Sequence, residues 1–193
     1  MKNLLLVLLF VPLVSFGQTL QKSFDKDVAV YYGKSFLMKD VLGAPNDNYS
    51  KFEITPLTAS SSREVTTIYY YSEEKNKEGL IIGFFDRYYS NAGGLGREYA
   101  FKNLNITKAS SLISKIDSIL DTEKKWLNSN LDSNNIYFNF EDITILIYRT
   151  EAFQGRIRMF WNGLDAEWEN SSFNKTRRRL FNNSKDSIWK LKD

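Results

Sequence analysis

Three carboxylates alternate with other residues in the stretch LDAEWEN near the C-terminus. If this stretch is a β-strand, Asp165, Glu167 and Glu169 point to one face, with neighbours about 6.5–7 Å apart. Carboxylates about 5–9.5 Å apart hydrolyse glycosidic bonds when burial raises the pKa of one of them. The three residues are therefore candidates for general acid–base catalysis. The alternative interpretation is a solvated acidic face over a buried Trp168, as on any strand with one buried face.

Two arginines precede this acidic stretch at the same alternating spacing. Arg156 and Arg158 lie in RIRM, and the pair Asn162-Gly163 separates the two segments. Asn-Gly between two strand-like segments is typical of a two-residue hairpin turn. The two strands should pair, which would place the arginines opposite the carboxylates. This arrangement favours the structural interpretation of both sets.

Oxygen-bearing side chains follow the spacing of a calcium-binding loop over NLDSNNIYFNFE. They fall at the first, third, fifth and twelfth positions, which are Asn130, Asp132, Asn134 and Glu141. The sixth position is Asn135 instead of Gly, and the following residues favour a strand instead of a helix. A polar surface turn is the alternative. The sequence predicts no metal site, with calcium as the alternative at these four positions.

A glycine-rich stretch, SNAGGLGREY, follows a strand-like run. Its glycines do not match the spacing of a dinucleotide-binding motif and lie between two strands, so a hairpin loop is expected. Such a loop can still contact a ligand. Tryptophan can stack on a ligand as well, although it more often fills a core. The candidate ligand-binding residues are Gly93, Gly94, Gly96, Arg97, Trp161 and Trp168.

The residue types that are absent exclude several kinds of site. The 193 residues include no His and no Cys, which excludes disulfides, imidazole or thiolate zinc sites, and Ser-His-Asp or Cys-His catalysis. The chain has 26 basic and 23 acidic residues, a net charge of +3, which argues against a nucleic-acid partner. No cofactor motif is complete, so no cofactor is predicted.

The first residues, MKNLLLVLLFVPLVSFGQ, have the pattern of a secretory signal peptide spanning residues 1–17. The apolar run is shorter than a membrane-spanning helix, and no transmembrane segment is expected after cleavage. No cysteine follows the run, so a lipoprotein is excluded. The ending SFGQ resembles export signals common in the Bacteroidota. The chain is therefore expected in the periplasm or outside the cell, with residues 18–193 as a single domain.

Periodicity predicts one antiparallel sheet of six or seven strands in an α+β fold. β-Branched and aromatic residues dominate the segments from residue 52 onward, and polar turns separate them. Asn162-Gly163 is the clearest turn, and no internal repeat is evident.

Apolar residues at helical spacing predict three helices. A long amphipathic helix is expected over 108–127 with Thr107 as its cap, and a shorter one over 172–182 with Ser171 or Ser172 as its cap. A short helix near 34–42 should end at Gly43. The long helix should lie against the sheet.

Two function classes remain. The first is a non-enzymatic binding or protein-interaction module of the cell envelope, whose partner is an envelope protein or a small ligand. The second is a carboxylate-dependent hydrolase that acts on glycan or a similar envelope substrate through Asp165, Glu167 or Glu169. The sequence leaves the oligomeric state open.

Overall fold

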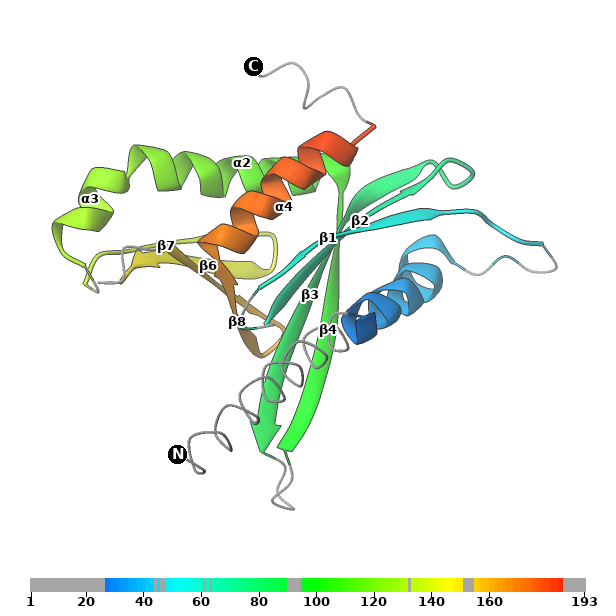
Figure 1. Ribbon diagram of the computed structural model, residues 1–193, viewed down its shortest axis with the longest axis horizontal. Coiled ribbons are helices and arrows are strands. Elements are labelled where there is room, and N and C mark those ends of the chain that lie inside the picture. The colour runs from blue at the N-terminus through cyan, green and yellow to red at the C-terminus, as the bar shows by residue number, and fades with distance from the viewer. Residues whose placement is uncertain are drawn as a thin grey trace, which may run out of the picture.

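Two four-stranded antiparallel sheets form the framework of the molecule (Figure 1). The computed structural model describes residues 27–43, 45, 48–60, 62, 64–89, 95–131, 133–150 and 155–185, with 86–89 and 95–97 described by their backbone. Sheet A has the order β1-β2-β3-β4, and sheet B has the order β5-β6-β7-β8. The strands of sheet A are β1 (Glu53–Ala59), β2 (Val65–Ser72), β3 (Lys77–Tyr89) and β4 (Leu95–Asn105). Those of sheet B are β5 (Asn135–Phe140), β6 (Ile143–Arg149), β7 (Gly155–Trp161) and β8 (Leu164–Glu169).

One helical segment precedes sheet A in the chain, two helices lie between the two sheets, and one helix follows sheet B. Residues 27–36 are α-helical and continue into the π-helical turn η1 (Leu37–Leu42). Helices α2 (Ile106–Thr122) and α3 (Lys124–Ser129) connect the sheets, and α4 (Asn170–Asn183) follows β8. A helical segment followed by a four-stranded meander therefore occurs twice in the described chain. No repeat is evident in the sequence, because the two halves share topology without sharing residues.

Sheet A is covered on both faces, which explains why β2 is buried almost throughout. The N-terminal helix covers one face, where Leu37 and Val41 pack with Ile68 and Ile81. The other face packs on α2, α4 and sheet B (Figure 1). Strands of a sheet that is covered on both faces have continuous apolar runs in their sequences, instead of alternating apolar and polar residues.

Sheet B has one buried face and one solvated face. Buried and half-buried residues alternate along β6 and β8. Ile145, Met159 and Ala166 occupy paired positions on neighbouring strands, and all three belong to the core shared with sheet A. The alternation of buried and half-buried residues along β6 and β8 matches the mostly alternating apolar and polar residues in their sequences.

The α+β class and the antiparallel pairing are confirmed, but the expectation of one sheet of six or seven strands is wrong. Glu141 adopts a left-handed φ of 53° and turns the chain, so the segment from 135 to 149 forms two strands. Helices α2 and α3 then separate β4 from β5 in sequence, and the two meanders close as separate sheets.

The Asn162-Gly163 turn is confirmed. Both residues have positive φ, 52° and 77°, and Trp161 pairs with Leu164 across the turn. Positive φ at both central residues is what this type of hairpin turn requires. Gly43, with φ of 73°, ends η1 as expected.

The predicted helix boundaries need correction. The helix expected over 108–127 breaks at Glu123 into α2 and α3. The side chain of Asn105, and not Thr107, caps α2 by accepting a hydrogen bond from the Lys108 N–H at 2.9 Å. Helix α4 spans 170–183 instead of 172–182 and has no side-chain cap. No helix in the described part of the chain is both long and apolar enough to cross a membrane.

Candidate functional site

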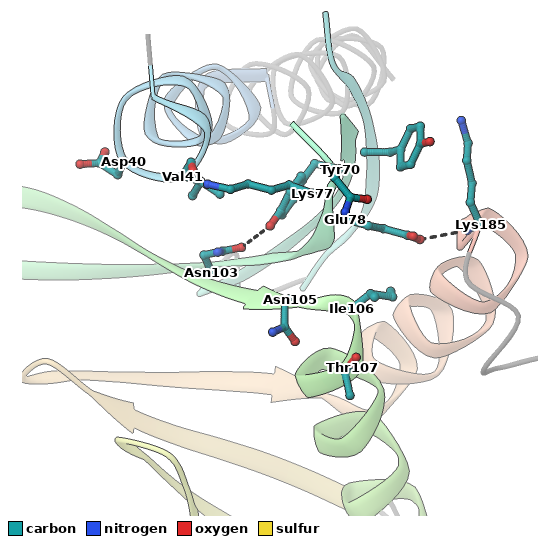
Figure 2. A pocket seen from close by; sticks show the side chains of 12 residues that line it. Asp40, Val41, Tyr70, Lys77, Glu78, Asn103, Asn105, Ile106, Thr107 and Lys185 are labelled. Carbon is teal, nitrogen blue, oxygen red and sulfur yellow. Dashed lines mark hydrogen bonds between the residues drawn. The ribbon is translucent and has the colours of Figure 1, made fainter. Parts of the chain in front are cut away.

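A polar pocket of about 720 Å³ lies at the end of sheet A (Figure 2). Its walls come from η1, the ends of β2 and β4, the start of β3, the first turn of α2 and residue 185. Pockets of about 300–1,000 Å³ are typical of small-molecule sites. The pocket forms where the β2–β3 hairpin, the start of α2 and the segment after α4 converge.

A buried tyrosine forms the inner end of the pocket. The Tyr70 hydroxyl donates a hydrogen bond to Oδ1 of Asn103 at 2.8 Å (Figure 2). Burial raises the pKa of Tyr70 above its usual range. The tyrosine therefore stays protonated at neutral pH and serves as a donor, not as a nucleophile.

Glu78 connects the pocket to the segment that follows α4. Its Oε1 accepts hydrogen bonds from the Tyr69 hydroxyl at 2.9 Å, the Ser184 hydroxyl at 3.0 Å and the Lys185 N–H at 2.9 Å. Burial and the neighbouring Glu78 raise the pKa of Tyr69. An oxygen that accepts three donors is held in place, so Glu78 is a structural anchor in this arrangement.

The rim of the pocket carries charges of both signs. Lys77 Nζ donates to the Val41 carbonyl of η1, and Lys185 Nζ lies 3.9 Å from the centre of the Tyr71 ring. Lys77 and Lys185 balance Asp40 and Glu78 among the lining residues. A lining with two cations and two anions favours a neutral or zwitterionic ligand over a strongly charged one.

Three polar side chains of the lining, one beside Tyr70 and two nearer solvent, can face a ligand. Asn103 and Asn105 use their Oδ1 atoms for Tyr70 and Lys108, which leaves both amide NH₂ groups without a partner among the described residues. Thr107 lies beside them on the first turn of α2, with its side chain exposed. These groups supply hydrogen-bond donors from the end of β4 and the start of α2.

The acidic strand has the alternation that the sequence predicts, but its carboxylates lie outside this pocket. Asp165, Glu167 and Glu169 are half-buried on the outer face of β8. Arg158 Nε donates to Asp165 at 2.5 Å, and Arg156 forms an ion pair with Glu167. Both ion pairs run diagonally, because Arg158 is directly opposite Glu167 in the register. The expected arginine–carboxylate pairing is therefore confirmed.

Glu64 joins this acidic group, and the sequence analysis missed it. Its Oε2 accepts the Glu167 N–H at 2.6 Å, and Glu169 Oε1 accepts the Ser62 N–H at 2.9 Å. Burial, followed by repulsion from Glu167, raises the pKa of Glu64, and the hydrogen bond from the Glu167 N–H opposes this rise. The segment between β1 and β2 thus covers the free edge of β8. A separation of 103 residues hides this contact from any local pattern.

Glu64→Gln is expected to change how stability depends on pH. An acid whose pKa is raised by folding holds its proton more tightly when folded, so its contribution to stability falls as pH rises above about 4.3. Gln keeps an oxygen for the Glu167 N–H and does not titrate. The free energy of unfolding of the variant, relative to wild type, should therefore increase between about pH 4 and pH 7 in urea denaturation.

The matched control is Glu73→Gln, at an exposed position in the β2–β3 turn. Its difference from wild type should show a smaller change with pH. A Glu64→Gln difference that stays constant over the same range would contradict the burial of the Glu64 carboxylate.

The residues of the calcium alternative are not brought together. Strand β5 separates Asn134 from Glu141, and Glu141 forms an ion pair with Lys108. The Asn134 amide donates to the Trp126 carbonyl at 2.6 Å. Asp132 lies outside the described residues, among which no three His, Cys, Asp or Glu side chains are placed to hold a metal ion.

The candidate ligand-binding residues also lie apart. Gly93 and Gly94 fall outside the described residues, while Gly96 and Arg97 belong to β4, opposite Tyr88 and Arg87 of β3. The flanking strands thus pair as a hairpin, as expected.

The two candidate tryptophans are engaged within the fold. Trp161 donates its Nε1–H to Asp142 at 2.9 Å and packs on Phe84. Trp168 is fully buried in the core. Neither residue lines the pocket at the end of sheet A.

Sequence reasoning missed the pocket because its residues come from segments far apart in the chain. One local feature does mark it, since Gly79 follows the polar turn and faces Tyr70 across the β2–β3 pair. Comparison of the chain with protein-family models, characterised proteins and solved structures finds no match.

Proposed function

We propose that this protein is an exported, non-enzymatic binding module that holds a small, neutral, polar ligand in the pocket at the end of sheet A. Export rests on the signal-peptide pattern of residues 1–17. The ligand carries hydroxyl or amide groups that match the amides of Asn103 and Asn105. The balanced charges of the rim support a neutral ligand.

One observation carries the proposal: the pocket has the volume of a ligand site, and two of its ionisable side chains, Tyr70 and Glu78, are hydrogen-bonded to other protein groups. Tyr70 is a protonated donor bound to Asn103, and Glu78 accepts three hydrogen bonds on one oxygen. A catalytic base needs a free lone pair within reach of a substrate proton. This arrangement suits recognition better than proton transfer.

The hydrolase alternative receives less support. Asp165 and Glu167 are ion-paired with arginines, and the Glu169 side chain accepts the Ser62 N–H. Carboxylates bonded to arginines of the neighbouring strand are not free to contact a glycosidic oxygen, as a glycosidase acid must. We therefore place the binding function at the pocket and not on β8.

Thr107→Val tests the proposal at the rim of the pocket. Val keeps the shape of Thr and removes its hydroxyl, so a ligand that binds there should lose one hydrogen bond. The dissociation constant for N-acetylglucosamine, measured by calorimetric titration, should rise about 2- to 10-fold. N-acetylglucosamine is the probe because it is neutral and carries both hydroxyl and amide groups.

Thr122→Val is the matched control, because Thr122 is exposed at the opposite end of the same helix. It should leave the dissociation constant unchanged. Equal effects of the two substitutions would contradict binding at the start of α2.

A further inference from the structure

Three of the four sheet edges in the described structure are protected against pairing with another strand. In β1, Pro56 and a bulge between Pro56 and Thr58 interrupt the register, and Arg179 donates to the Leu57 carbonyl. Proline and bulges are common ways of closing an edge strand. Edge strand β8 is covered by Glu64, whose carboxylate accepts the Glu167 N–H at 2.6 Å.

Edge strand β4 is protected by charge. It contains Glu98 and Lys102, and charged side chains on an edge strand oppose the addition of a further strand. Lys102 Nζ also lies 2.6 Å from a carboxylate oxygen of Asp142, in the turn between β5 and β6. The edges of β1, β4 and β8 therefore each have a feature that limits the addition of a further strand.

The fourth edge, that of β5, has no such device. Its residues, NIYFNF, include no charge and no proline, and its register with β6 runs without a shift from Asn135 to Phe140. Among the described residues, no hydrogen bond reaches the β5 backbone from the side opposite β6. Tyr137 is 76% exposed, and Trp126, whose carbonyl accepts the Asn134 amide just before the strand, is 45% exposed. Exposed aromatics are typical anchors of protein interfaces.

The turn geometry determines which backbone groups are free. Phe140 and Ile143 flank the two-residue turn that joins β5 to β6, and residues in these positions bond to each other. Backbone groups of alternate residues point to opposite sides of a strand. The backbone N–H and C=O groups of Asn135, Tyr137 and Asn139 therefore point to the free edge of β5.

We infer that β5 pairs with β5 of a second copy of this chain, in an antiparallel register centred on Tyr137. In this register Asn135 faces Asn139 of the second copy, and Ile136 faces Phe138. When NIYFN is read against its own reverse, a polar residue faces a polar one, an apolar residue faces an apolar one, and Tyr137 faces Tyr137. A two-fold interface requires a surface that is complementary to itself in this way. The strand is uncharged although the chain carries +3, so the two edges meet without like-charge repulsion. Pairing joins the two copies of sheet B into one eight-stranded sheet.

Disulfide trapping tests the register directly, because the chain contains no cysteine of its own. In the proposed register two copies of residue 137 are a hydrogen-bonded pair with Cα atoms about 5.5 Å apart, within disulfide range. Tyr137→Cys should therefore give a covalent dimer under mild oxidation. Asn139→Cys should not, because the two copies of residue 139 lie about 14 Å apart.

Tyr137→Lys tests the equilibrium without relying on oxidation. Two lysines meet on the two-fold axis, so the dimer dissociation constant measured by analytical ultracentrifugation should rise at least about tenfold. Tyr49→Lys is the control, because Tyr49 is 78% exposed and lies outside sheet B. A wild-type protein that stays monomeric at high micromolar concentration, or equal trapping at 137 and 139, would overturn the inference. The first outcome includes the case in which the edge serves a strand of a different protein.

Discussion

Gly79→Ala is expected to lower the free energy of unfolding by about 3 kcal/mol, at the upper end for overpacking. A Cβ at residue 79 would lie 2.3 Å from the Leu104 carbonyl oxygen and 2.8 Å from the Tyr70 hydroxyl oxygen. The closer contact is to backbone, which cannot move without breaking the β3–β4 pairing. Urea denaturation followed by circular dichroism measures the loss.

Gly155→Ala is the matched control for this prediction. Gly155 also lies in a strand, but the nearest atoms to its added Cβ would be a Leu120 methyl carbon at 3.4 Å and Asn170 side-chain atoms at 3.9 Å, which are ordinary contacts. Gly155→Ala should lower the free energy of unfolding much less than Gly79→Ala does. Adding Tyr70→Phe should not rescue Gly79→Ala, since the Leu104 carbonyl remains in the way. Equal losses at the two glycines would contradict the close packing at the inner end of the pocket.

Trp168→Ala is expected to lower the free energy of unfolding by about 3–5 kcal/mol. Trp168 is fully buried between the sheets and packs edge-on against Phe173 of α4, with ring centroids 5.3 Å apart. Truncation would leave a cavity at the point where β8, α4 and the shared core meet. The midpoint of urea denaturation should fall accordingly.

Two further variants separate packing from the loss of an aromatic residue. Trp168→Phe should cost less than Trp168→Ala, because the indole Nε1–H has no hydrogen-bond partner among the described residues and its removal leaves nothing unpaired. Trp126→Ala, at a half-exposed position of α3, should also cost less. A small loss for Trp168→Ala would show that Trp168 is not part of the core and would restore it as a candidate ligand contact.

Local patterns predicted much of the secondary structure because the forces behind them are local. The alternation of Asp165 and Glu167 with buried neighbours follows from the strand period, and the turn at Asn162-Gly163 follows from tolerance of positive φ. The cap of α2 was misplaced by two residues, because Asn105 and Thr107 are both good capping residues.

Long-range relations could not be predicted in the same way. The periodicity of β4 and β5 does not reveal that they belong to different sheets, because the residue pattern of one strand does not identify the strand that pairs with it. Glu64 reaches β8 across 103 residues, and Tyr70 meets Asn103 across 33. The pocket depends on such contacts, so its residues could be identified only from the folded chain.

Chemical-shift mapping of the unmodified protein titrated with N-acetylglucosamine tests the proposed binding site most directly. The titration should move the backbone and side-chain amide signals of Asn103 and Asn105 and the backbone signal of Thr107. The signals of Asp165 and Glu167 on β8 should stay in place. No movement at millimolar ligand, or movement centred on β8, would contradict a ligand site at the end of sheet A.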